Sequence, residues 1–320
     1  MRLSFLFSTI SAAVVEIPLT RNIAGDYLVD AIVTCAENIT AIIDGKLLLW
    51  DHNYGSLPRG ALPRDQVDTF LNSDSHSMRY PGLDRALEIG VASRIRYGDL
   101  KATFGVHFGS DLFRFSGGSL SLIQRENQTQ FSLVVGSSIS DFETECVPET
   151  LVTLFIDPTR VHYDDHTTTE YTFRGSMRFE NYPQTYSVKI EQYPEVPDTI
   201  TYIPGELMNR IEAFLVGHKV SWSEDIRWFE NCDRELISRM PDITVSFISF
   251  DNVLSTLVVP PTSYSKYDPE TNSCSLRFAR NYQDDSATDH RKIIFNPLRL
   301  EGFNFRLDQS EYSVKICRSF

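Results

Sequence analysis

Ala41-Ile42-Ile43-Asp44-Gly45-Lys46-Leu47-Leu48-Leu49-Trp50 is the stretch around which this chain of 320 residues is organised. One apolar run leads into an Asp-Gly pair, and a second apolar run leads away from it to a tryptophan. Asp-Gly between apolar runs is the strongest short-range hairpin signal, which favours a turn at Asp44. The alternative is a carboxylate held at the tip of a loop between two buried strands. The choice depends on whether a second such loop exists in the other half of the chain.

The composition is that of a folded protein built mainly from strands. Apolar residues make up 42% of the chain, and its 21 phenylalanines and 14 tyrosines favour strands over helices. The formal net charge of −13 argues against a nucleic-acid partner, because binding to a phosphate backbone needs clustered Lys and Arg.

Residues 1–13 have the pattern of an export signal: Arg2, an apolar stretch from 3 to 10, and small residues from 11 to 13. No later run reaches the roughly 18 apolar residues that a membrane span needs. We therefore expect a secreted or lumenal protein without a membrane span. Two glycosylation sequons agree with that location, one at Asn38 and one at Asn127.

Five cysteines in an exported chain predict one or two disulfides and an unpaired remainder. The spacing alone leaves the pairing of Cys35, Cys146 and Cys317 open. No Cys-x-x-Cys pair or paired-histidine spacing occurs, so we do not expect a structural metal site. We also expect no cofactor. His162 and His166 flank two aspartates and have the residue types of a metal site, but a solvated loop is the simpler interpretation.

Short alternating runs broken by turns predict strands along most of the chain, and the fold class is mostly β with one clear helix. Residues 51–90 lack periodicity, which indicates a long surface segment. The helix is expected from Pro204 to Val216, where apolar residues recur at helical spacing. The polar segment 137–150 is a candidate boundary, which divides the mature chain into lobes 14–145 and 146–320.

The second half contains the partner of the opening stretch, Val196-Pro197-Asp198-Thr199-Ile200-Thr201-Tyr202-Ile203-Pro204. It resembles the second catalytic loop of pepsin-like aspartic peptidases, in which a strand ends in Asp-Thr-Gly and a short apolar link enters a helix. Further stretches resemble parts of the same family in the same order. These are the flap at residues 95–99, the Pro-Asp-Ile strand at 241–243 with Pro260-Pro261 and flanking cysteines, and the closing strands at 293–314.

The resemblance implies a bilobal acid-protease fold, two β-barrel-like lobes with a central cleft, with part of the N-terminal lobe missing. It implies an Asp44/Asp198 catalytic dyad, support from the Thr199 hydroxyl, and a flap tyrosine at Tyr97. It also implies a Cys232–Cys274 disulfide and a monomer that takes a peptide or protein in its cleft. No basic inhibitory prosegment is expected between the signal and the first strand.

Both loops depart from the family's pattern. Asp44 is followed by Gly45-Lys46, so the threonine is absent, and Ile200 replaces the glycine after Asp198-Thr199. Three interpretations follow. The chain is a secreted pepsin-like protein with impaired or lost peptidase activity, an active aspartic endopeptidase with unusual loops, or an unrelated β-rich binding module.

Overall fold

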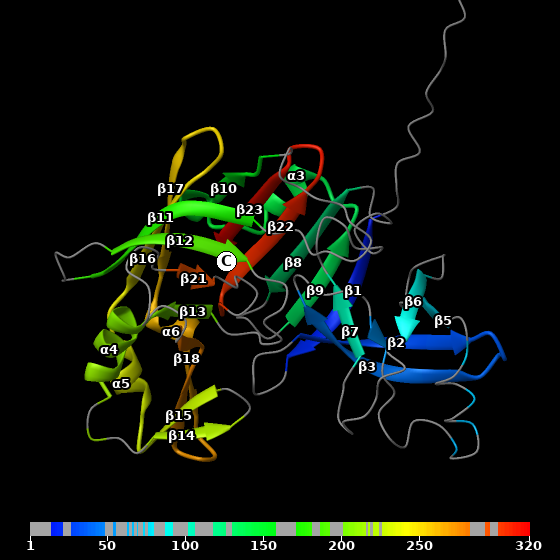
Figure 1. Cartoon of the computed structure of the whole chain (residues 1–320), viewed down its shortest axis with the longest axis horizontal. Coiled ribbons are helices and arrows are strands. Elements are labelled where there is room, and N and C mark those ends of the chain that lie inside the picture. Colours follow the sequence, from blue (N-terminus) through cyan, green and yellow to red (C-terminus); the bar gives the residue numbers. More distant parts are fainter. Residues whose placement is uncertain are drawn as a thin grey trace, which may run out of the picture.

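The computed structural model describes residues 14–21, 27–48, 54–55, 76–79, 87–91, 102–105, 118–125, 130–157, 171–180, 186–192, 201–215, 220–223, 226–281, 292–294 and 300–320, and the single residues 63, 66, 69, 73 and 217. These residues form three sheets with a few short helices (Figure 1). The fold is mostly β, as the sequence predicts.

The largest sheet contains strands from both ends of the chain. Its order is β10-β23-β22-β8-β9-β1-β2-β3-β7-β4-β6-β5 in the described part. From the first half come β1 (Val15–Arg21), β2 (Tyr27–Cys35), β3 (Thr40–Leu48), β4 (Tyr54–Gly55), β5 (His76–Arg79), β6 (Leu87–Val91), β7 (Ala102–Gly105), β8 (Ser119–Arg125) and β9 (Gln130–Val135). From the second half come β10 (Val152–Phe155), β22 (Phe303–Asp308) and β23 (Ser313–Arg318). The predicted boundary at residue 145 therefore divides the sequence but not this sheet.

The other two sheets belong to the second half. One has the order β17-β16-β11-β12-β21-β13-β20, and the other has the order β14-β15-β19-β18. Their strands are β11 (Tyr171–Phe179), β12 (Tyr186–Gln192), β13 (Thr201–Pro204), β14 (Val220–Ser223), β15 (Ile226–Glu230), β16 (Ile243–Ile248), β17 (Leu254–Val259), β18 (Ser265–Asp268), β19 (Ser273–Leu276), β20 (Phe278–Asn281) and β21 (Lys292–Ile294).

The described helices are short and have identifiable starts. They are α3 (Ile139–Glu143), the 3-10 turn η1 (Pro148–Thr150), α4 (Gly205–Ala213), α5 (Arg234–Ser238) and α6 (Pro261–Tyr264). Ser138 caps α3 in a capping box with Asp141, and the Asp233 carboxylate accepts from the Leu236 N–H at the start of α5. The predicted helix at 204–216 is confirmed as α4, and the other helices are too short to leave a periodic signal.

One main core joins the sheets. Fully buried side chains from β1, β9, α4, β16 and β22 belong to the same cluster, including Ile17, Leu133, Met208, Ile243 and Leu307. Tyr264 is also buried, and its hydroxyl donates to the Pro241 carbonyl at 2.8 Å. Burial raises the pKa of this phenol well above its ordinary value. The two halves of the sequence thus share one apolar interior.

Two disulfides form, and one described cysteine stays free. Cys232 pairs with Cys274, as the family resemblance implies, with a Cα–Cα separation of 5.5 Å. Cys146 pairs with Cys317 across 171 residues at 5.6 Å, a pairing that the sequence left open. Cys35 is a buried free thiol. The prediction of one or two disulfides with an unpaired remainder is confirmed.

The prediction that residues 51–90 form a long surface segment is wrong in part, because the short strands β4, β5 and most of β6 lie within it. Tyr54 pairs with Gly90 and Thr103, and β5 pairs with both β6 and β2. Strands of two to five residues carry too few side chains for their alternation to be recognised in a polar segment.

Candidate functional site

Asp44 lies inside a strand. The backbone of β3 runs without interruption through Asp44 and Gly45, and Asp44 is directly opposite Asp30 of β2. Gly45 is in register with Val29 on one side and with Ala102 of β7 on the other. The predicted turn or loop tip at Asp44-Gly45 is therefore wrong.

The turn that joins β2 to β3 comes earlier, where Asn38 adopts a left-handed φ of 61°. Its N–H donates to the Cys35 carbonyl at 2.9 Å, and the Cys35 N–H donates to the Ile39 carbonyl at 3.0 Å. Asparagine tolerates this conformation better than most residues. Because the turn lies at Asn38, the β2–β3 ladder extends past Asp44. Each residue from 40 to 46 is paired with a residue between 28 and 34.

Asp198 and Thr199 lie outside the described residues, between the end of β12 at Gln192 and the start of β13 at Thr201. The elements on the C-terminal side of this segment are firmly held. Thr201 is fully buried, and β13 lies between β21, which is antiparallel to it, and β20, which is parallel to it. Ile203 and the α4 residues Leu207, Met208 and Ile211 are completely buried.

The meeting of Asp44 with Asp198 remains a prediction, since only the backbone of the first is described. Tyr97, Asn127, His162, His166 and Trp50 also fall outside the described residues. Asn38 is exposed at its turn, and Thr40 of the same sequon is exposed at the start of β3. Among the predicted residues, the structure thus places the Cys232–Cys274 pair and one accessible sequon.

An ionic cluster of two buried guanidinium groups and a half-buried carboxylate lies beside β13. The Glu301 carboxylate contacts the Arg277 guanidinium at 3.0 Å and the Arg21 guanidinium at 3.5 Å. The Arg277 carbonyl accepts from the Thr201 N–H at 3.3 Å, three residues after Asp198. Because Arg21 ends β1, the cluster links the N-terminal strands to the segment that follows Asp198. Three charged residues so far apart in sequence give no signal that sequence reasoning could use.

A buried glutamine makes a second polar link between the two halves. Gln124 of β8 donates to the Tyr27 hydroxyl and to the Phe303 carbonyl, both at 2.9 Å. Its carbonyl oxygen accepts from the Gly302 N–H, also at 2.9 Å. Buried polar groups of this kind fix relative positions because an unpaired one is costly.

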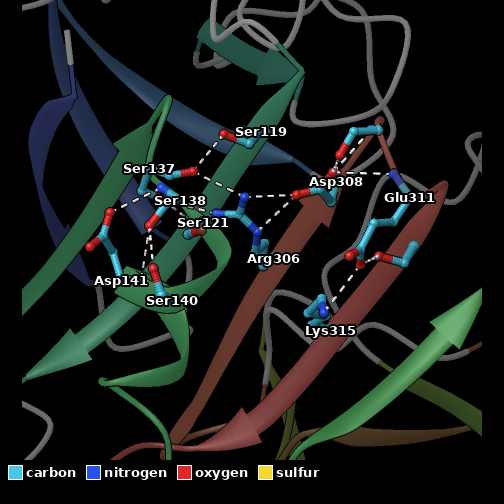
Figure 2. A network of polar contacts seen from close by, with 12 residues as sticks. Ser119, Ser121, Ser137, Ser138, Ser140, Asp141, Arg306, Asp308, Glu311 and Lys315 are labelled. Atoms are coloured by element: carbon cyan, nitrogen blue, oxygen red, sulfur yellow. Dashed lines mark hydrogen bonds and ion pairs between the residues drawn. The ribbon is translucent and has the colours of Figure 1, made fainter. Parts of the chain in front are cut away.

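Figure 2 shows a third buried network, centred on Arg306 of β22. Its guanidinium donates to Asp308 at 2.7 Å, to the Ser137 hydroxyl at 2.9 Å and to the Ser121 hydroxyl at 3.2 Å. Burial raises the pKa of the Asp308 carboxyl, but donation from the Ser310 hydroxyl and from Arg306 outweighs burial and holds this pKa below the ordinary aspartate value. The network fixes the start of the segment 137–150 to the C-terminal strands.

No group of three or more His, Cys, Asp or Glu side chains suited to a metal occurs among the residues with described positions. Within the same residues, no helix is long and apolar enough to cross a membrane. The two disulfides are typical of proteins from oxidising compartments and fit an extracellular or lumenal protein.

The comparisons with known proteins define the fold. No protein-family model matches the sequence, and no curated protein matches it. The architecture, however, is that of a pepsin-like aspartic proteinase. The chain is similar to the crystal structure of the aspartic proteinase from Irpex lacteus, with a TM-score of 0.63 and 11% identity over 96% of this chain and 98% of that one. At this identity the likeness establishes the fold alone.

Proposed function

We propose that this protein is a secreted pepsin-like-fold protein that binds a peptide or protein segment between its two halves, with peptidase activity impaired or lost. The observation that carries the proposal is the uninterrupted strand through Asp44 and Gly45. The pepsin-like fold supplies the expectation of a peptide-binding cleft.

Aspartic peptidase chemistry needs two carboxylates about 3 Å apart that share one proton. One deprotonates a water molecule and the other protonates the scissile carbonyl. The family's glycine donates its N–H to the carboxylate, whereas Gly45 is held in register between β2 and β7. Displacing a catalytic group by about 1 Å costs on the order of 10²-fold in rate. A strand geometry at Asp44 therefore favours impairment.

The second loop adds to this argument. Ile200 stands where the family has glycine, and a β-branched residue is excluded from positive φ and suits a close backbone approach poorly. Lys46 places a cation two residues from Asp44, which would favour the ionised carboxylate if it points toward it. Loss of a single donor near a catalytic group costs roughly 10²–10³ in rate.

The alternative function is an active aspartic endopeptidase that uses Asp44 and Asp198 as a dyad, Thr199 as loop support and Tyr97 as the flap. One observation favours it: one residue after Asp198-Thr199 the chain enters β13 and then α4, which carry buried side chains. The third interpretation, an unrelated β-rich module, is not retained because the pepsin-like fold covers nearly the whole chain.

The proposal also covers the cellular location of the protein and its division into two lobes. Residues 1–13 act as the export signal, and glycans attach at Asn38 and Asn127. The exposure of Asn38 and the two disulfides support this location. Residues 14–145 and 146–320 form the two lobes, joined through the sheet that contains strands of both.

Cleavage of quenched peptides from pH 3 to pH 6 tests the proposal, with a transition-state-mimicking inhibitor as a probe. We expect background cleavage in the native protein, unchanged in Asp44→Asn and Asp198→Asn. We also expect saturable binding of the inhibitor or of a library peptide by calorimetry. Inhibitor-sensitive turnover that disappears in Asp198→Asn would establish the active endopeptidase instead. Absence of all peptide and inhibitor binding would contradict the binding role.

A further inference from the structure

Three adjacent strands, β11, β16 and β17, present a regular open face in the second half. Their registers align side chains in rows of three, one from each strand. The rows are Arg174–Ile248–Leu254, Ser176–Ser246–Thr256 and Arg178–Thr244–Val258. The opposite face of the same strands carries buried residues such as Met177, Val245 and Leu257. One face thus packs into the core, and the other faces solvent.

The outward face becomes more apolar and more exposed toward β17. Leu254 is 65% exposed, Val258 is 45% exposed and Ile248 is 39% exposed. The turn between the two strands adds Phe250 at 60% and Val253 at 49%. Large apolar side chains gathered on one face of a soluble protein usually mark a contact surface.

β17 is also the last strand of its sheet. In the described part of the chain its only strand pairing is with β16, and the Ser255 hydroxyl on its inner face donates to the Thr153 carbonyl of β10. In Figure 1 it lies at the margin of the second half, away from β2 and β3. Natural proteins protect such edges with charged residues, proline or bulges, because an open edge invites pairing with another chain. The outward residues of β17, Leu254, Thr256 and Val258, include none of these.

Charge favours this edge for contact between two copies of the chain. With a net charge of −13, two copies repel each other over most of their surfaces. The outward side chains of β16 between Thr244 and Ile248, like those of β17, are uncharged. The charged residues nearest to them in the described part of the chain are Arg174 and Arg178 on β11, Asp242 just before β16, and Asp251 in the turn between β16 and β17. A neutral, apolar edge is where copies meet with the least repulsion.

We propose that β17 pairs antiparallel with β17 of a second copy, about a twofold axis that passes by Thr256. In that register Leu254 faces Val258 of the second copy, and Thr256 faces its own counterpart. Leucine–valine and threonine–threonine are both favourable cross-strand pairs, and the symmetry repeats each of them. The arginines of β11 lie two strands away from the joined edge in each copy. This symmetric, reversible dimer differs from the monomer that the sequence led us to expect.

The pairing covers one strand and its neighbours, so we expect it to bury less than the roughly 800 Å² per partner of a standard interface. We therefore expect a dissociation constant in the micromolar range, which means a dimer weaker than an obligate one. The proposal does not depend on peptidase activity, because this face lies outside the Asp44 and Asp198 segments.

Sedimentation velocity over a range of concentrations tests the proposal on the full chain. Thr256→Lys places two like charges face to face at the axis and should raise the dissociation constant at least tenfold. Ser176→Lys, in the same row but two strands from the edge, is the matched control and should leave the dimer unchanged. A chain that stays monomeric at high micromolar concentration overturns the proposal. So does a dimer that is indifferent to Thr256→Lys.

Cross-linking gives an independent measurement. Directly opposed residues in antiparallel strands have Cα atoms about 4.5–5.5 Å apart, which is within the range that a disulfide spans. Thr256→Cys should therefore form a disulfide-linked dimer under mild oxidation, and Ser176→Cys should not. Equal cross-linking of the two variants would show random collision and exclude the proposed register. Circular dichroism of each variant verifies that it is folded.

Discussion

Cys146 and Cys317, which are 171 residues apart in sequence, are joined by a disulfide that ties the segment before β10 to the last strand of the chain. Ser319 forms an isolated β-bridge with Cys146 beside it. The bond therefore fixes the C-terminal strand to the segment that links the two halves.

Removing this bond should destabilise the protein more than removing Cys232–Cys274. In the chain-entropy model a loop of 171 residues corresponds to about 5 kcal/mol, and one of 42 residues to about 4 kcal/mol. Urea unfolding of Cys146→Ser/Cys317→Ser and Cys232→Ser/Cys274→Ser measures both. A loss below about 1 kcal/mol for the first pair would mean that packing alone holds the C-terminal strand.

Arg306→Ala should cost about 3–5 kcal/mol of unfolding free energy, because it leaves the Asp308 carboxylate buried without its guanidinium. The double variant Arg306→Leu/Asp308→Leu should recover part of that loss, since it removes both charges. Chemical denaturation at pH 7 provides the comparison. If the single and double variants were equally destabilised, the charge of Asp308 would not be the cause.

The same carboxylate predicts a dependence on pH. The folded-state pKa of Asp308 is lowered, so its stabilising contribution is present above the unfolded pKa of about 3.9. That contribution is lost as the pH falls through the lower folded-state pKa. Asp308→Asn should flatten this part of the stability profile between pH 5 and pH 2, measured by thermal unfolding at each pH. A pH–stability profile identical to that of the native protein would mean that groups other than Asp308 cause the pH dependence.

Glu301→Gln should destabilise the protein by about 2 kcal/mol or more, because two buried guanidinium groups lose their shared carboxylate. Glu16→Gln is the matched control: its contact with Arg125 is exposed and should contribute less than about 1 kcal/mol. Both free energies come from urea unfolding at one salt concentration. Equal losses would show that the cluster beside β13 has no special role.

Asn38→Gln should remove one glycan from protein expressed through a eukaryotic secretory pathway. Asn38 and Thr40 are exposed at the β2–β3 turn, so a glycan there meets no packed surface. Mass spectrometry before and after enzymatic deglycosylation detects the change, with Asn127→Gln as the parallel variant. Secreted protein without any glycan at residue 38 would contradict the assignment.

Local pattern was sufficient for the fold class and for many strands. Short alternating runs predicted strands along most of the chain, and apolar spacing predicted α4. The predicted turn at Asp44 was wrong because the pairing of β3 with β2 outweighs the local turn preference of Asp-Gly. That pairing involves residues outside a ten-residue stretch, so a local pattern does not reveal its free energy.

From the sequence, the candidate site was predictable only as two separate motifs, one at Asp44 and one at Asp198. The resemblance identified Asp198 with its following helix, and α4 does begin where it should. It gave no indication of Arg21, Arg277 and Glu301, whose contact joins residues from three distant segments.

The sequence by itself determined that this protein is a β-rich chain with two Asp-bearing segments and two cysteines that flank the Pro-Asp-Ile strand. Periodicity, composition and short motifs are local properties, which is why the sequence was sufficient for these features. Only the tertiary structure decided that strands from both ends share one sheet, that Cys146 binds Cys317, and that Asp44 lies within a ladder. These features depend on contacts between residues far apart in the chain, whose free energy arises only when the strands have come together.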